Sequence, residues 1–128
     1  MGEAPDWQRW LTEGLVDLDV DVLNPRRPDW DSSWKQELAD PQFRGQVEWE
    51  LTGLEHASLV AMYLAPNTRA PISLMELGLV ARHEGVVVCC PEGYWRKGNV
   101  DVVCARYGIA QVPTLDALLA AVRARLAG

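Results

Sequence analysis

Two uninterrupted apolar runs, residues 59–64 (LVAMYL) and 86–90 (VVVCC), constrain the fold more than any other feature. Runs of this length are typical of strands that are buried on both faces of a sheet. Each run is followed by a loop and then by a helical pattern, with helix starts near residues 71 and 100. Because strands that alternate with helices form parallel sheets covered on both faces, the sequence predicts a three-layer α/β fold.

The other expected elements follow from shorter signals. Apolar spacing predicts a helix over residues 6–15, and the alternation of apolar and acidic residues over 16–23 predicts a strand with one exposed face. Asp40, followed by proline, predicts the start of a long helix. A brief last strand is expected over residues 109–112, before a helix capped by Thr114.

Composition narrows the class of protein. The 128 residues suit one domain, and a net charge of −6 argues against a nucleic acid polymer as partner. No segment reaches the ~18 apolar residues of a membrane span, and the first residues lack the features of a signal peptide, so a cytoplasmic protein is expected. Three cysteines without metal spacing predict buried free thiols, and we expect neither a metal nor a cofactor.

Three loops, beginning after residues 23, 64 and 90, should meet at the carboxyl edge of the sheet, where open α/β sheets bind ligands. The first loop carries Arg26 and Trp30. A guanidinium suits phosphate or carboxylate, and an indole offers a stacking face for a base. Alternatively, the arginines pair with nearby aspartates and the tryptophans seal the core.

Glu76 is the first candidate for chemistry, because it lies near the start of the helix that follows the second loop. The helix dipole favours a carboxylate there, and helical side chains lean back toward the sheet edge. Gly78 would allow the helix to lie close to a strand or a ligand. The alternative is that Glu76 only stabilises the helix start. Glu48 and Glu50 lie in the middle of the preceding helix; one could reach the same edge, and either could be a solvated residue.

Four segments together resemble the nucleoside 2-deoxyribosyltransferase-like family: residues 23–34, 42–51, 71–78 and 93–101. The Glu-Leu-Gly triplet within PISLMELG is a weak signal by itself, whereas the four blocks in this order are more specific. The resemblance covers nearly the whole chain, residues 1–128, and implies a flavodoxin-like or Rossmann-like parallel sheet.

The resemblance implies cleavage of the N-glycosidic bond of a nucleoside or nucleotide, with transfer of the sugar to another base or to water. Glu76 matches the family's nucleophile, which attacks the anomeric carbon of the sugar. Chemically, a carboxylate close to an oxocarbenium-like centre suits this role. The second acid, which assists the departing base, is expected from the preceding helix, with Glu50 as first choice and Glu48 as second.

The expected substrate contacts come from several segments. Asn99 matches the place where relatives hold the 5′ end of the sugar, often across a subunit interface. Asn24 and Ser73 are further candidates on the resembling segments. Arg26 and Trp30 are candidates for base or phosphate contacts on their chemistry alone. Because relatives complete their sites between subunits, we expect a homodimer or a higher homo-oligomer.

The sequence departs from the family pattern in two ways. Some deoxyribosyltransferases carry an aspartate six residues before the nucleophile, where this sequence has Ala70. Relatives also begin with a buried strand and a glycine-containing loop, and no apolar run precedes Asp6, so the usual first strand is expected to be missing. The alternative hypothesis belongs to a different class of function: the protein is a non-catalytic nucleotide-binding or assembly module that retains the fold.

Overall fold

The computed structural model describes residues 6–24, 36–83 and 85–127, which form an α/β fold with a parallel sheet in the order β1-β2-β3. Within these ranges, none of the helices is long and apolar enough to cross a membrane. The elements are α1 (Trp7–Glu13), α2 (Pro41–His56), β1 (Val60–Tyr63), α3 (Pro71–Val80), β2 (Val86–Cys89), α4 (Lys97–Tyr107), β3 (Ala110–Val112) and α5 (Leu115–Ala127).

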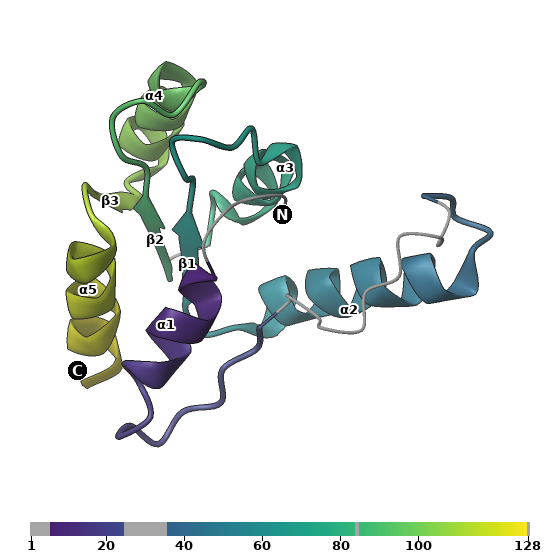
Figure 1. Ribbon diagram of the computed structural model, residues 1–128, viewed down its shortest axis with the longest axis horizontal. Helices are drawn as coiled ribbons and strands as arrows, with labels where there is room; N and C mark the ends of the chain where they lie inside the picture. Colours follow the sequence, from purple (N-terminus) through teal and green to yellow (C-terminus); the bar gives the residue numbers. More distant parts are fainter. Residues whose placement is uncertain (1–5, 25–35, 84, 128) are drawn as a thin grey trace.

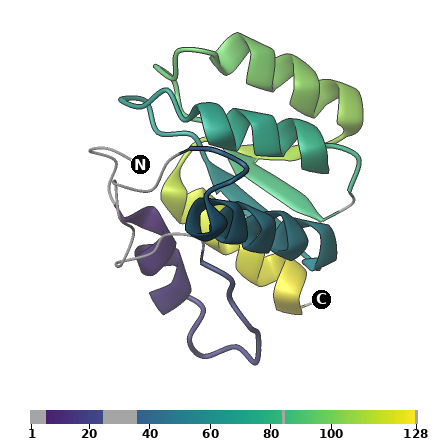
Figure 2. The same cartoon turned by 90° about the vertical axis from the view of Figure 1, so that its right-hand side faces the viewer.

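Helices cover both faces of the sheet, as predicted (Figures 1 and 2). One apolar cluster joins β1 and β2 to α3 and α4, and a second joins the opposite faces of the same strands to α1 and α5. The arrangement is consistent with the flavodoxin-like or Rossmann-like fold that the sequence implied. Both strand pairs are parallel, with Val60 opposite Val86 and Val87 opposite Ala110.

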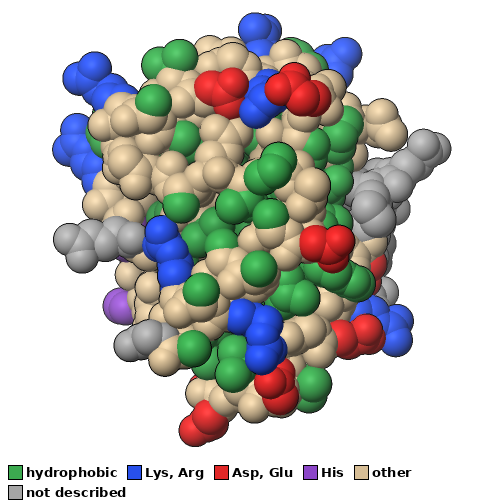
Figure 3. Space-filling view, turned by 90° about the vertical axis from the view of Figure 1, so that its left-hand side faces the viewer, with side chains coloured by type: hydrophobic (Ala, Val, Ile, Leu, Met, Phe, Trp, Pro, Cys, Tyr) green, Lys and Arg blue, Asp and Glu red, His purple; other side chains and the backbone are tan. Residues whose placement is uncertain are grey.

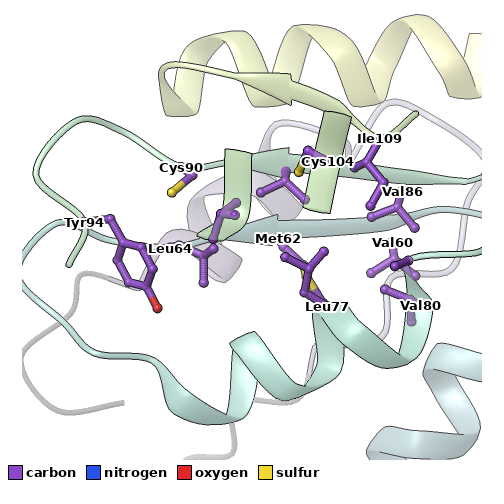
Figure 4. Packing of buried hydrophobic residues seen from close by; sticks show 13 residues of the cluster. Val60, Met62, Leu64, Leu77, Val80, Val86, Cys90, Tyr94, Cys104 and Ile109 are labelled. Carbon is purple, nitrogen blue, oxygen red and sulfur yellow. The ribbon is translucent and has the colours of Figure 1, made fainter. Parts of the chain in front are cut away.

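The central strand, β2, explains why one apolar run is uninterrupted. Val86 and Val88 contribute to the α3–α4 cluster, while Val87 and Cys89 contribute to the α1–α5 cluster. All four side chains are buried because both faces are covered. Figure 4 shows the packing on the α3 side, where α3 supplies side chains against the strands. The three cysteines are free and buried, which confirms the prediction.

Two predicted helix starts are confirmed by their capping contacts. Asp40 Oδ1 accepts hydrogen bonds from the backbone N–H of Gln42 at 3.0 Å and of Phe43 at 3.1 Å. Thr114 Oγ1 accepts one from the backbone N–H of Ala117 at 3.1 Å. Gly108, with φ of 66°, ends α4 in the left-handed conformation that glycine adopts without strain.

The strand predicted over residues 16–23 is wrong. The segment turns and then continues as irregular chain, with Val16 83% exposed and Leu23 56% exposed. Alternation supplies one apolar face, but a strand also needs a neighbour to satisfy its backbone groups, and no strand in the described ranges pairs with this segment. Instead, Arg123 on α5 holds Asp17 through contacts of 2.7 and 2.9 Å.

Helix α2 is less buried than its sequence predicts, since Phe43, Val47, Leu51 and Leu54 recur at the spacing of one side that should face the core. Leu54 near its carboxyl end packs against the α3–α4 cluster, whereas Phe43 and Val47 are only partly buried. The helix extends away from the sheet in Figure 1. Its one buried residue is polar, Gln46, and lies one turn before Glu50.

Candidate functional site

The loops after β1 and β2 meet at the carboxyl edge of the sheet, as expected for neighbouring parallel strands. The Tyr94 hydroxyl donates a hydrogen bond to the Arg69 carbonyl at 2.5 Å, and the Trp95 Nε1–H donates to the same oxygen at 2.9 Å. Figure 4 shows the buried Tyr94 ring beside Leu64, at the end of β1. These two bonds fix the loop directly before α3, where Ala70 adopts a left-handed φ of 45°.

Glu76 lies in the second turn of α3, one turn before the buried Val80. Residues four apart lie on the same side of a helix, so Glu76 shares the side of α3 that packs on the sheet. Its side chain is consequently half-buried rather than directed into solvent.

Glu50 is placed by the same spacing on α2. It lies one turn before Leu54, which packs against the cluster that contains Val80, and one turn after the buried Gln46. Glu50 is itself half-buried, and its charge acts on Glu76. The fold thus brings together two carboxylates that are 26 positions apart in the sequence, Glu50 and Glu76.

Burial controls the titration of this pair. It raises the pKa of Glu76 from about 4.5 to about 7, and the negative charge of Glu50 contributes to the increase. Burial also raises the pKa of Glu50, against the opposing effect of a hydrogen bond with Gln46. The expected gain of an ionised Glu76 from the helix dipole is therefore outweighed by desolvation.

Glu48 occupies a different environment from Glu50. It lies on the exposed part of α2, where its Oε1 accepts from Arg44 Nε at 3.3 Å. Two residues correspond to about 200° around a helix, so Glu48 and Glu50 face different ways. The structure thus pairs Glu50, and not Glu48, with Glu76.

Gly78 does not serve a close approach of α3 to a strand. A Cβ added there would meet nothing within 4 Å, so the expected approach to a strand is wrong, while the approach to a ligand stays a prediction. The residue leaves open space one position after Leu77, on the exposed part of α3.

Two of the predicted substrate-binding residues, Ser73 and Asn99, lie at helix starts that follow this edge. Ser73 is half-buried in the first turn of α3, and Asn99 is exposed in the first turn of α4. Asn24 is half-buried and makes an interaction of its own. Arg26 and Trp30 lie outside the described residues.

Other features of the described chain lie away from the carboxylate pair. No group of three His, Cys, Asp or Glu side chains within these ranges is arranged to hold a metal ion. A shallow hollow lies before β1 and β2, at the amino edge of the sheet, opposite to the loops described above. It is lined by Ser58, Leu59, Gly85, Arg125 and Leu126.

Neither Gln46 nor Arg69 is predicted as a site residue from the sequence. Gln46 could have been found from its place one turn before Glu50, where a polar residue interrupts a half-buried stripe. Arg69 carries no such signal, because its importance comes from contacts with Tyr94 and Trp95, 25 and 26 positions further on.

A comparison with protein families identifies a family for most of the chain. The family model described as nucleoside 2-deoxyribosyltransferase like matches residues 1–94. The matched range includes both Glu50 and Glu76 and ends before Asn99. A comparison with curated proteins finds no match.

Proposed function

Because the chain belongs to the nucleoside 2-deoxyribosyltransferase-like family, we propose that it cleaves the N-glycosidic bond of a 2′-deoxynucleoside or its 5′-phosphate. The observation that carries the proposal is the coupled pair of half-buried carboxylates, Glu76 on α3 and Glu50 on α2. Two carboxyl groups with different protonation states are what a double-displacement reaction at an anomeric carbon requires.

In the first step, a Glu76 carboxylate oxygen attacks C1′ of the sugar. The C1′–N bond breaks, its electron pair goes to the base, and the Glu50 carboxyl group protonates the departing base. The product is a deoxyribosyl ester of Glu76. A positively charged sugar in the transition state is stabilised by the negative charge that Glu76 carries at that point.

In the second step, water or a second base attacks C1′, and the ester bond breaks to release Glu76 as a carboxylate. Glu50, now ionised, accepts the proton of the attacking nucleophile and is ready for another cycle. Hydrolysis and transfer differ only in this acceptor, so the same pair of carboxylates serves either reaction.

The shifted pKa values suit a pair that shares one proton. Burial raises the pKa of both carboxyl groups, that of Glu76 to about 7, and the like charge of Glu50 disfavours ionisation of both groups at once. A sugar that becomes positive at C1′ favours the ionised form of Glu76. The proton is then available at Glu50, where the reaction uses it.

A substrate panel tests the proposal. Deoxynucleosides and their 5′-monophosphates are incubated with the protein, with and without an acceptor base, and the products are separated by chromatography. Free base without an acceptor indicates a hydrolase, and a new nucleoside only with an acceptor indicates a transferase. A protein that is thermally stabilised by these compounds but releases no base from any of them is a binding module, and the enzymatic proposal is then wrong.

A further inference from the structure

The two loops that meet before α3 and α4 hold a pair of arginines against one tryptophan ring. The guanidinium carbon of Arg69 lies 5.4 Å from the centre of the Trp95 ring, and that of Arg96 lies 4.6 Å from it. Trp95 is itself anchored, because its Nε1–H donates to the Arg69 carbonyl at 2.9 Å. The ring thus keeps two cations together at the carboxyl edge of the sheet.

These two charges are not neutralised by neighbouring carboxylates. In the parts of the chain that the structure describes, neither Arg69 nor Arg96 forms an ion pair. The acidic residues closest in sequence to Arg96, Glu92 and Asp101, both act on Lys97 instead. The ring offsets part of the repulsion between these like charges, and a bound anion would offset more of it.

The cluster is accessible and rigidly attached. Trp95 is 49% exposed and both arginines are exposed, so a ligand can reach them. The buried Tyr94 fixes the backbone of Arg69 through its hydroxyl, at 2.5 Å. On another face of the molecule, which includes α5, basic and acidic side chains are interspersed (Figure 3).

The position of the cluster relative to Glu76 suits one substrate. Arg69 directly precedes Ala70, the N-cap of α3, and Glu76 follows six residues later. At the rise of an α-helix, the six residues from Ala70 to Glu76 span about 9 Å along the axis. A ligand whose sugar lies at Glu76 can therefore place a group attached to that sugar near the start of α3, where the helix dipole also favours an anion.

We propose that Arg69 and Arg96, held together by Trp95, form the subsite for the 5′-phosphate of the substrate. The inference rests on the proposed function and narrows it, because the preferred substrate becomes a 2′-deoxynucleoside 5′-monophosphate. Planar guanidinium groups bind phosphate oxygens through paired, charge-assisted hydrogen bonds. Because the overall charge is −6, a local cationic site would offset the repulsion that a dianionic substrate meets.

The decisive measurement is the ratio of kcat/KM for a deoxynucleoside 5′-monophosphate to kcat/KM for the matching deoxynucleoside. The double substitution Arg69→Gln with Arg96→Gln should lower this ratio by about 100-fold, as expected for two lost charge-assisted contacts. Arg69→Lys with Arg96→Lys should restore part of it, since charge returns without the planar fork. Arg106→Gln, which removes an exposed arginine at the other end of α4, is the matched control and should leave the ratio unchanged.

Inorganic phosphate separates a general anion site from recognition of the nucleotide. It should compete with the monophosphate in the original protein and lose that effect in the double Gln variant. An unchanged ratio in the double Gln variant, or an equal loss for both substrates, would overturn the subsite.

A binding measurement keeps this result distinct from the failure of the enzymatic proposal. Titration calorimetry with a deoxynucleoside 5′-monophosphate should show weaker binding to the double Gln variant even if the substrate panel yields no product. In that case the subsite stands and the reaction does not. A protein that cleaves deoxynucleosides but gains nothing from the phosphate would leave the reaction in place and refute the subsite.

Discussion

Two clusters of ionisable groups lie on the α3–α4 side of the sheet, and they differ in how well their charges are satisfied. Lys97 at the start of α4 donates to the Cys90 carbonyl at 3.0 Å, to Asp101 Oδ1 at 3.0 Å and to Gln111 Oε1 at 3.2 Å. Glu76 on α3 has no such counter-ion in the described chain, and the nearest charge that acts on it is the like charge of Glu50.

The difference separates a structural role from a chemical one. The three contacts of Lys97 join the residue after β2, α4 and β3, and they hold the ammonium group in its ordinary charged form. The Glu50–Glu76 pair instead keeps a proton close to neutral pH at a cost in stability, which is the behaviour expected of groups that act on a ligand. Substitutions in the two clusters should consequently affect different measurements.

Glu76→Gln should have the largest effect. Loss of the nucleophile should lower kcat/KM by about 10⁴-fold or more, because no covalent intermediate can form. The same variant should be more stable than the original protein, since it removes a carboxylate that resists ionisation in the folded state. Chromatographic turnover assays and thermal unfolding at several pH values measure both effects.

The sign of the stability effect follows from linkage. The unfolded carboxyl group ionises near pH 4.5 and the folded one near pH 7, so the original protein loses stability as the pH rises between these values. The advantage of Glu76→Gln should therefore grow over this range and level off above it. Turnover retained in a folded Glu76→Gln variant would remove Glu76 as the nucleophile.

Glu50→Gln should have the second largest effect. Loss of the general acid should lower kcat/KM by about 10² to 10³-fold. The loss should be smaller for substrates whose base departs without protonation, which chromatography with a series of modified bases can measure. Glu48→Gln is the matched control, because Glu48 lies two residues away on the same helix and is exposed. Equal losses in the two variants would mean that α2 itself, and not the Glu50 carboxyl group, is responsible.

The pH dependence of kcat/KM provides a third test. Because the active form of the pair carries one proton, activity should fall above a pH of about 7, by about tenfold per unit once the proton is lost. In Glu50→Gln the remaining activity should instead rise with pH and level off, since only ionisation of Glu76 is then required. A profile that has the same shape in both proteins would contradict the shared proton.

Local signals were sufficient to predict most of the fold. The apolar runs identified β1 and β2, and the capping residues Asp40 and Thr114 identified the starts of α2 and α5. The failure at residues 16–23 has a physical cause, because periodicity describes the faces of a segment and not the presence of a neighbouring strand. Helix α4 begins at Lys97, earlier than the start near residue 100 that its apolar residues predicted. The side chain of Lys97 contacts the residue after β2 and Gln111 on β3.

The candidate site was less predictable than the fold. Glu50 and Glu76 could be proposed from their positions and from a family resemblance, but burial decides that their pKa values rise, and burial depends on how α2 packs beside α3. The contacts of Arg69 with Tyr94 and Trp95 join two loops that no local pattern relates. Such contacts emerge only once parallel strands place their carboxyl ends side by side.

Lys97→Met should have the smallest of these effects and should be seen in stability alone. The substitution keeps the aliphatic stem but removes three hydrogen bonds, so the free energy of unfolding should fall by about 1–2 kcal/mol. Part of the contribution of the exposed Asp101 is already lost to solvent screening. Denaturant unfolding monitored by tryptophan fluorescence gives the free energy, and kcat/KM per folded molecule should stay within about twofold, given that Lys97 is engaged in these structural contacts. A loss of turnover without a loss of stability would move Lys97 from the structural cluster to the site, and the contrast between the two clusters would then be wrong.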